Sequence, residues 1–183
     1  MEPLMPTTVA DLIRIDHREF ERMFAELEDS TKRPLTGPAV VALIAAHARA
    51  EESEVYPVIR AKTDAASKVE HSQEEHAEAD ELAAKLVGLG TDDPDYDGVL
   101  ERLVKSVSHH IEEEEETVLP ALDQLPLDQQ EQLATAFTRV RAEHLTAGAA
   151  DLSRSELKRQ AQNEGVSGTA SMTKDELKQE VRD

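Results

Sequence analysis

The chain has 183 residues, no cysteine and a formal net charge of −19 at neutral pH; 32% of its residues are charged and 3% are aromatic. The missing cysteine excludes disulfides, thiolate zinc sites, iron–sulfur clusters and cysteine nucleophiles, and it fits a reducing compartment. A surface this acidic disfavours non-specific binding to nucleic acid or anionic lipid. Residues 1–20 lack the pattern of a signal peptide, and no apolar run approaches the about 20 residues of a membrane span, so we expect a cytoplasmic protein.

The first predicted helix begins after a capping-box pattern, Thr8 with Asp11, and ends near Ser30 before a turn rich in proline and glycine. Its apolar residues recur at helical spacing, so they form one buried stripe, and that stripe also holds a histidine. The stripe consists of Ile13, His17, Phe20, Phe24 and Leu27.

The second predicted helix runs from about Pro38 to about Lys62. Pro57 is expected to bend it, because a proline inside a helix removes a backbone hydrogen bond. Two of the six positions on its inner stripe are polar, His47 and Glu51. The full stripe is Val40, Ile44, His47, Glu51, Val55 and Val58.

The third helix is predicted from about Asp64 to Leu89 and has one histidine on its inner face. That face consists of Val69, His76, Ala79, Ala83 and Leu86. The fourth helix is predicted from about Asp95 to Asp123, and Pro120 repeats the position of Pro57. Its inner face consists of Leu100, Leu103, Val107, His110, Glu114, Val118 and Ala121. No strand pattern is present, so we expect an all-α fold.

A fifth helix is predicted from Asp128, as its N-cap, to about Thr146, packed outside the bundle. The composition changes after Gly148: residues 1–148 hold 14 Lys and Arg against 32 Asp and Glu, whereas residues 149–183 hold 6 against 7. We therefore expect one domain over residues 1–148 and a small appendage over residues 149–183. Ser153 with Glu156, and Thr173 with Glu176, are capping boxes for two short helices in the appendage.

One motif occurs twice, as His-x-x-x-Glu-Glu-x-x-Val-x-Pro beginning at His47 and again at His110. Positions i and i+4 share one face of a helix, so each motif presents an imidazole and a carboxylate side by side. An isolated buried carboxylate costs several kcal/mol unless it is paired or binds metal. Four histidines and two glutamates on the inner faces of four successive helices require a common explanation, and a metal cluster supplies one. The six are His17, His47, Glu51, His76, His110 and Glu114.

Four imidazoles and two carboxylates suit a site with two metal ions and bridging carboxylates, because a tetrahedral zinc ion needs only four ligands. Imidazole together with carboxylate suits iron, and two neighbouring ions could share a bound oxygen species. An ordinary bundle core with hydrogen-bonded histidines is the alternative for any single one of these histidines.

The arrangement His17, His47-x-x-x-Glu51, His76 and His110-x-x-x-Glu114 resembles the hemerythrin-like, or HHE, domain over roughly residues 8–146. The resemblance implies an up-down four-helix bundle around an oxo- or hydroxo-bridged, non-haem di-iron centre. It also implies that the four histidines are terminal ligands and that the two glutamates bridge. Members of the family bind dioxygen, respond to nitric oxide or iron status, or react with peroxide.

The chain departs from the oxygen carriers of that family at two positions. Those carriers have a further histidine four residues before the third-helix ligand, where this chain has Ser72, and His71 lies about 100° away around the helix. They also have an aspartate at i+5 on the fourth helix, whereas Glu114 is at i+4. The departures favour redox chemistry or sensing over reversible oxygen carriage.

Other polar residues near the motifs are expected to serve secondary roles. His109 is expected to face away from the core, and His71 and His144 to be exposed or to lie behind the ligands. The remaining acidic residues of the motifs are expected on a solvated face, with Glu52 and Glu115 as alternative ligands if a helix is rotated. They are Glu52, Glu112, Glu113, Glu115 and Glu116. Tyr56 is interpreted as a packing residue, with hydrogen bonding near the metals as the alternative.

The appendage resembles the helix–extended–helix motif of Rho N-terminal or SAP-like modules, over Leu152–Ala161, Gly165–Gly168 and Met172–Leu177. Such modules often contact nucleic acid, but the near-neutral charge leaves little electrostatic affinity. The sequence thus favours a di-iron protein that reacts with dioxygen, peroxide or nitric oxide. A non-enzymatic oxygen or iron sensor signalling through the appendage, and a zinc-binding structural bundle, are the alternatives.

Overall fold

The computed structural model describes residues 8–147, 169, 172–173 and 176–177, and in that part of the chain every regular element is a helix. This agrees with the predicted all-α class. The expected domain boundary after residue 148 and most of the appendage lie outside the described residues. Within the described part of the chain, no helix combines the length and the apolar composition that crossing a membrane requires.

Helix α1 spans Val9–Leu27 and is capped as the sequence predicts. The side chain of Thr8 accepts a hydrogen bond from the backbone of Asp11 at 3.2 Å, and the carboxylate of Asp11 accepts one from the backbone of Thr8 at 3.0 Å. This reciprocal pair satisfies two backbone donors that the helix leaves open. All five residues of the predicted stripe are buried.

Helix α2 spans Arg33–Ala50 and begins five residues before the predicted start at Pro38. Pro34 lies in the first turn, where its missing N–H costs nothing because no partner is available there. Pro38 therefore lies inside the helix rather than at its beginning. The predicted start at Pro38 is therefore wrong, because Pro34 is the proline that marks the beginning of the helix.

The expected bend near Pro57 takes the form of a π-helical turn. The chain continues from α2 through η1, Glu51–Val55, into the short helix α3, Tyr56–Lys62, and the N–H of Tyr56 donates to the carbonyl of Glu51. This i→i+5 turn absorbs one extra residue before the proline and shifts the helical phase. Ile59 is consequently buried, whereas the predicted Val58 is only partly buried.

Helix α4 spans Ala66–Gly88 and α5 spans Tyr96–Thr117, and the predicted inner residues of both are buried. The predicted fourth helix is interrupted near Pro120, since α5 ends at Thr117 and the short helix α6 covers Leu119–Asp123. In both copies of the motif the long α-helix is thus interrupted before the proline, because α2 gives way to η1 before Pro57 and α5 ends at Thr117 before Pro120.

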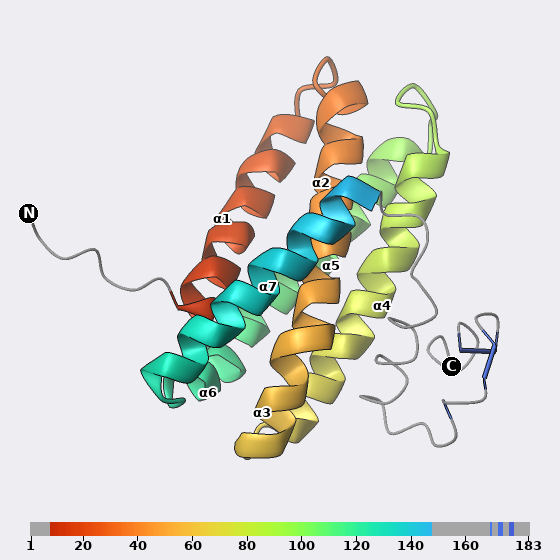
Figure 1. The fold of residues 1–183 in the computed structure, drawn as a ribbon. Helices are drawn as coiled ribbons and strands as arrows, with labels where there is room; N and C mark the ends of the chain where they lie inside the picture. Colours follow the sequence, from red (N-terminus) through yellow and green to blue (C-terminus); the bar gives the residue numbers. More distant parts are fainter. Residues whose placement is uncertain (1–7, 148–168, 170–171, 174–175, 178–183) are drawn as a thin grey trace, which may run out of the picture.

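Helices α1, α2, α4 and α5 lie side by side as a helical bundle (Figure 1), and α1 contacts α2 and α5 while α4 contacts the same two helices. Helix α7, Leu127–Ala147, crosses obliquely over α1 and α2. It begins one residue before the predicted cap, because Gln129 and Gln130 donate to the carbonyl of Pro126, so Asp128 lies within the first turn.

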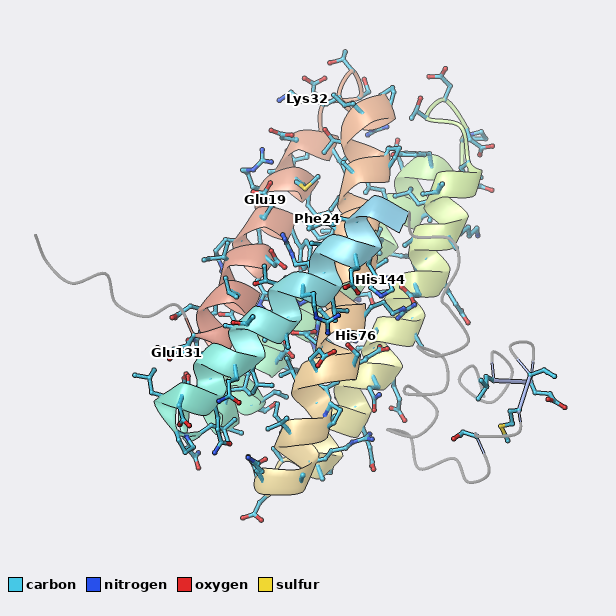
Figure 2. All side chains as sticks on the ribbon, in the orientation of Figure 1. Glu19, Phe24, Lys32, His76, Glu131 and His144 are labelled. Carbon is cyan, nitrogen blue, oxygen red and sulfur yellow. The ribbon has the colours of Figure 1, made fainter. Side chains whose placement is uncertain are left out.

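The bundle contains two apolar clusters with a polar layer between them. One cluster includes Phe20 and Ile44, and the other includes Ile13 and Ala50. On each helix the predicted ligands lie near the point where residues of one cluster give way to residues of the other; His76, for example, lies away from both ends of the bundle (Figure 2). The apolar clusters therefore position a small set of polar side chains in an interior that excludes water.

Of the appendage, the structure describes the second predicted capping box. Thr173 accepts from the N–H of Glu176 at 3.3 Å, and the carboxylate of Glu176 accepts from the N–H of Thr173 at 2.7 Å. The reciprocal hydrogen bonds of the predicted capping box are thus present, and Glu176 and Leu177 are helical. The first capping box, Ser153 with Glu156, and the connection at 165–168 lie outside the described residues.

Candidate metal centre

The polar layer brings together all six side chains that the sequence singled out. Each is at least 94% buried, and each histidine turns its Nε2 atom toward a glutamate oxygen. The distances are 3.2 Å for His17–Glu114, 3.2 Å for His47–Glu51, 3.4 Å for His76–Glu51 and 3.7 Å for His110–Glu114. The Nε2 atoms of His76 and His110 are 3.1 Å apart. The layer is therefore a compact set of nitrogen and oxygen donors.

The two glutamates lie between pairs of histidines from different helices. Oε1 of Glu51 faces His47, and Oε2 of Glu51 faces His76. Oε2 of Glu114 faces His17 and His110. The side chains accordingly fall into two groups that could each hold a cation and that share Glu51. The first is His17, His47, Glu51 and Glu114, and the second is Glu51, His76 and His110.

A second layer of carboxylates holds the other nitrogen, Nδ1, of every histidine. A carboxylate only accepts hydrogen bonds, so Nδ1 donates, and in the neutral imidazole that binds a metal Nε2 then keeps its lone pair directed inward. The pairs are His47 with Asp16 at 3.1 Å, His76 with Glu52 at 3.1 Å, His110 with Glu75 at 2.9 Å, and His17 with Glu115 at 2.9 Å. All four imidazoles are fixed in the tautomer that a metal requires.

These outer carboxylates form a closed ring around the bundle. Each one is the immediate chain neighbour of an inner residue on its own helix, and it holds the histidine of the next helix. Consecutive helical residues point about 100° apart, so an acid beside an inward-facing residue reaches sideways to the adjoining helix. The order is α1 to α2, η1 to α4, α4 to α5 and α5 to α1.

The close contact of acids and imidazoles changes their proton affinities. Burial alone would lower the pKa of His47, but Glu51 and Asp16 outweigh it and raise that pKa to about 9. Burial also opposes the charge on His76, yet Glu51 and Glu52 raise its pKa to about 10. Against the effect of burial, His47 and His76 hold the pKa of Glu51 well below its usual value. A metal ion therefore competes with protons for these nitrogens.

Tyr56 lies fully buried beside both glutamates. Its hydroxyl donates to Oε1 of Glu114 at 3.0 Å and lies 3.4 Å from Oε2 of Glu51, and its ring stacks on His76. Burial and the neighbouring carboxylates raise the pKa of this phenol well above its usual value, so it stays a donor. The interpretation of Tyr56 as a packing residue is thus incomplete, because its hydroxyl also donates a hydrogen bond to one of the predicted ligands.

Helix α7 supports the site from outside the bundle, a role that the sequence analysis missed. The guanidinium of Arg141 donates to both oxygens of Asp16, at 2.6 and 2.7 Å. The ring of Phe137 packs edge-on against the ring of His47, with centroids 5.6 Å apart. No local pattern in α7 marks these two residues, because their partners lie more than 80 positions earlier in the chain.

Several buried atoms of the inner layer have no hydrogen-bond partner, and they show whether these residues suit a cation. In the part of the chain that the structure describes, Nε2 of His17, Nε2 of His47, Oε1 of Glu51 and Oε2 of Glu114 are buried and unpaired. Unsatisfied buried polar atoms cost about 1–3 kcal/mol each and are rare in native proteins. All four belong to one of the two candidate groups, so a cation at this place would satisfy them together.

The other residues that the sequence analysis named fall into two kinds, those that hold an inner histidine and those that face away from the inner layer. Glu52 and Glu115 were expected on a solvated face or as alternative ligands, and instead they hold histidines from behind; Glu52 is only 3% exposed. Their position directly after the inner glutamates could have shown this role. His109 and His71 face away from the inner layer, as expected, with side chains 59% and 50% exposed.

A comparison with known proteins gives a family. The model of the hemerythrin HHE cation-binding domain matches residues 8–122, which is more than half of the chain. A protein named DNA nickase, from Nostoc sp. (strain PCC 7120 / SAG 25.82 / UTEX 2576), is 28% identical over 133 residues. The match covers 70% of this chain but only 38% of that relative. No solved structure matches the chain significantly. With cation-binding groups in its core and more than half its length matched, the chain belongs to the hemerythrin HHE cation-binding domain family.

Proposed function

We propose that the chain is an up-down four-helix hemerythrin-like protein whose buried layer holds two non-haem iron ions and reacts with dioxygen, peroxide or nitric oxide. The observation that carries this proposal is the set of buried, unpaired nitrogen and oxygen atoms that face one another between the two apolar clusters. The proposed ligands are His17, His47, Glu51, His76, His110 and Glu114.

The charge balance of the region supports the binding of cations. Six carboxylates surround the four histidines: Asp16, Glu51, Glu52, Glu75, Glu114 and Glu115. Three guanidiniums pair with members of this set, namely Arg18 with Glu115, Arg49 with Glu52 and Arg141 with Asp16. With neutral imidazoles the region keeps an excess of negative charge, and buried charge requires compensation. Bound metal ions would supply this compensation.

Iron in this environment would supply redox chemistry and a place for a small oxygen-containing ligand. The protein's own contribution is to orient and insulate. The ring of outer carboxylates fixes the direction of each Nε2 atom, and Tyr56 fixes one oxygen of Glu114. The apolar clusters on either side exclude bulk water, which favours a small ligand over a large substrate.

Metal analysis combined with the optical spectrum tests the proposal. Protein produced with iron should contain about two irons per chain and show oxo-to-iron charge-transfer bands in the near ultraviolet when oxidised. A content below about one iron per chain, with zinc in its place, would favour the structural zinc alternative. Turnover of peroxide by the iron-loaded protein distinguishes a redox enzyme from a sensor, which would bind its ligand without turnover.

The Nostoc relative named DNA nickase carries a second candidate function. A site with two metal ions can activate water and stabilise both oxygens in a phosphodiester cleavage. The acidic surface of this chain opposes that function, since DNA is itself an anion. Incubation of supercoiled plasmid with the metal-loaded protein at low salt tests it: conversion to the open circular form would support nicking, and unchanged plasmid would dismiss it.

The partner of the appendage is a further part of the proposal. Its resemblance to Rho N-terminal or SAP-like modules supports contact with nucleic acid, and Lys158, Arg159, Lys174 and Lys178 are the proposed phosphate contacts. Affinity that falls as salt rises would support this assignment. Negligible binding at low salt would leave the appendage as a site for another protein.

A further inference from the structure

A third group of potential ligands lies outside the bundle core, between α4 and α5. His71, Glu75 and Glu113 have donor atoms that all lie within 4.8 Å of one another. His109 is next to them, with its Nε2 atom 3.5 Å from Glu113 and 3.8 Å from Glu75. Two imidazoles and two carboxylates from two adjacent helices therefore meet at one surface position.

The outer group of ligands follows the same sequence pattern as the predicted ligands of the core. His71 with Glu75, and His109 with Glu113, are both His-x-x-x-Glu pairs on one helical face. On α5 the outer pair precedes the inner pair by one position, so it points about 100° away from the core. The expectation that His71 and His109 face away from the core was right, but it did not reveal that they converge.

Glu75 provides a second and independent observation. Its side chain is only 9% exposed, and its Oε1 atom is buried without a hydrogen-bond partner, although Oε2 accepts from His110 at 2.9 Å. The unpaired Oε1 points between the outer imidazoles, 3.7 Å from Nε2 of His71 and 3.8 Å from Nε2 of His109. These separations are too long for hydrogen bonds.

The separations suit ligands of a common metal ion. Zinc lies about 2.0–2.1 Å from its nitrogen and oxygen ligands, which places the ligand atoms of a tetrahedral site about 3.3 Å apart. The four histidine–glutamate pairs range from 3.1 Å for His71–Glu113 to 3.8 Å for His109–Glu75. The exposed side chains of His71 and His109 and the partly buried side chain of Glu113 can adjust by a few tenths of an ångström.

We propose that His71, Glu75, His109 and Glu113 form an outer binding site for a borderline divalent cation of the Zn²⁺ or Fe²⁺ class. Nitrogen and carboxylate donors select such ions over Ca²⁺, which prefers oxygen ligands alone. The site is open to solvent on the side of the exposed residues His71 and His109, so it exchanges metal readily. Glu75 belongs to both centres, because its two oxygens face the outer site and the inner ligand His110 respectively.

Equilibrium dialysis of the iron-loaded protein against dilute Zn²⁺, followed by metal analysis, tests the outer site. The wild-type chain should bind about one more zinc per chain than His71→Ala or Glu113→Gln. Glu112→Gln is the matched control, since Glu112 is an exposed neighbour of Glu113 on the same helix. It should bind as much zinc as the wild type.

Equal zinc content in all four proteins would overturn the outer site, as would an equal loss in the Glu112→Gln control. Iron measured on the same samples keeps this test separate from the inner centre. A zinc difference without iron in the core would support the outer site while removing the di-iron proposal. Normal iron content with no zinc difference between the variants would overturn the outer site while leaving the di-iron proposal intact.

Discussion

Asp16 on α1 accepts a hydrogen bond from Nδ1 of His47 on α2, at 3.1 Å. The same carboxylate accepts two hydrogen bonds from Arg141 on α7, at 2.6 and 2.7 Å. A bidentate guanidinium–carboxylate pair has one preferred geometry, so α7 fixes the orientation of the acid and, through it, of the imidazole. Three helices, of which α7 is far from the other two in the sequence, thus determine where one nitrogen of the candidate metal centre points.

Replacement of Asp16 by Asn should weaken metal binding. The amide keeps the shape of the carboxylate but loses its charge, so it holds His47 less firmly and leaves Arg141 with a poorer partner. Loss of such an outer hydrogen bond typically lowers metal affinity about 10- to 100-fold. Competition with a chelator of known affinity measures the change. Glu28→Gln, a substitution of an exposed residue at the C-terminal end of the same helix, is the control; equal affinities in both variants would contradict the proposed role.

Removal of either bridging candidate should abolish the dinuclear centre. Glu51→Ala removes the carboxylate that lies between His47 and His76, and Glu114→Ala removes the one between His17 and His110. Iron content should fall to about one per chain or less, and the near-ultraviolet bands should disappear. Glu112→Ala on the exposed face of α5 should keep both. Retention of two irons by the Glu51 and Glu114 variants would show that the ligand set is wrong.

Tyr56→Phe should destabilise the metal-free protein while leaving its fold intact. The hydroxyl donates to a buried carboxylate, and a hydrogen bond to a charged group is worth about 1.5–3 kcal/mol. For a domain of this size, that corresponds to a fall in the thermal midpoint of roughly 3–12 °C. Calorimetry of the apoprotein measures it. Tyr96→Phe is the control, because Tyr96 belongs to the apolar cluster that does not contain Tyr56; an equal fall would contradict a specific bond.

The stability of the metal-free protein should depend on pH through its inner histidines. The folded pKa values of His47 and His76, about 9 and about 10, exceed the ordinary value of 6.5. The stabilisation is thus fully present below pH 6.5 and is lost as the pH rises through 9 to 10. Thermal melts between pH 6 and 10 should show a falling midpoint for the apoprotein. The metal-loaded protein should lack this fall, since its imidazoles are neutral ligands; identical pH profiles would contradict the assignment.

The helices and the inner layer could be predicted because helical periodicity is a local property of the sequence. Every residue of the predicted stripes on α1, α4 and α5 is buried. On the second predicted helix the prediction holds as far as Val55 and then fails by one position, at Val58 and Ile59. The π-helical turn causes this shift, and a proline in a helix does not reveal by itself whether it will kink, break or widen the turn.

The support around the inner layer was harder to predict, since it depends on how helices pack. The side chain of Glu75 points between two helices, and whether it meets solvent or His110 depends on the distance between α4 and α5. The same holds for Arg141, whose partner is 125 positions away. Hydrophobic patterns fix which face of a helix is buried, but they do not fix which residue of the next helix lies opposite.

A chain ending at Gly148 should fold and bind metal like the full-length protein. Every proposed ligand and every outer carboxylate precedes that point, and so do Phe137 and Arg141 on α7. A chain ending at Pro126 retains the residues that match the family model, yet it lacks α7 and leaves Asp16 without Arg141. It should bind metal more weakly, by about the same 10- to 100-fold as Asp16→Asn. Iron content and chelator competition on both truncated chains measure the difference. Weak binding by the longer chain would show that the appendage supports the centre, and undiminished binding by the shorter one would show that α7 does not.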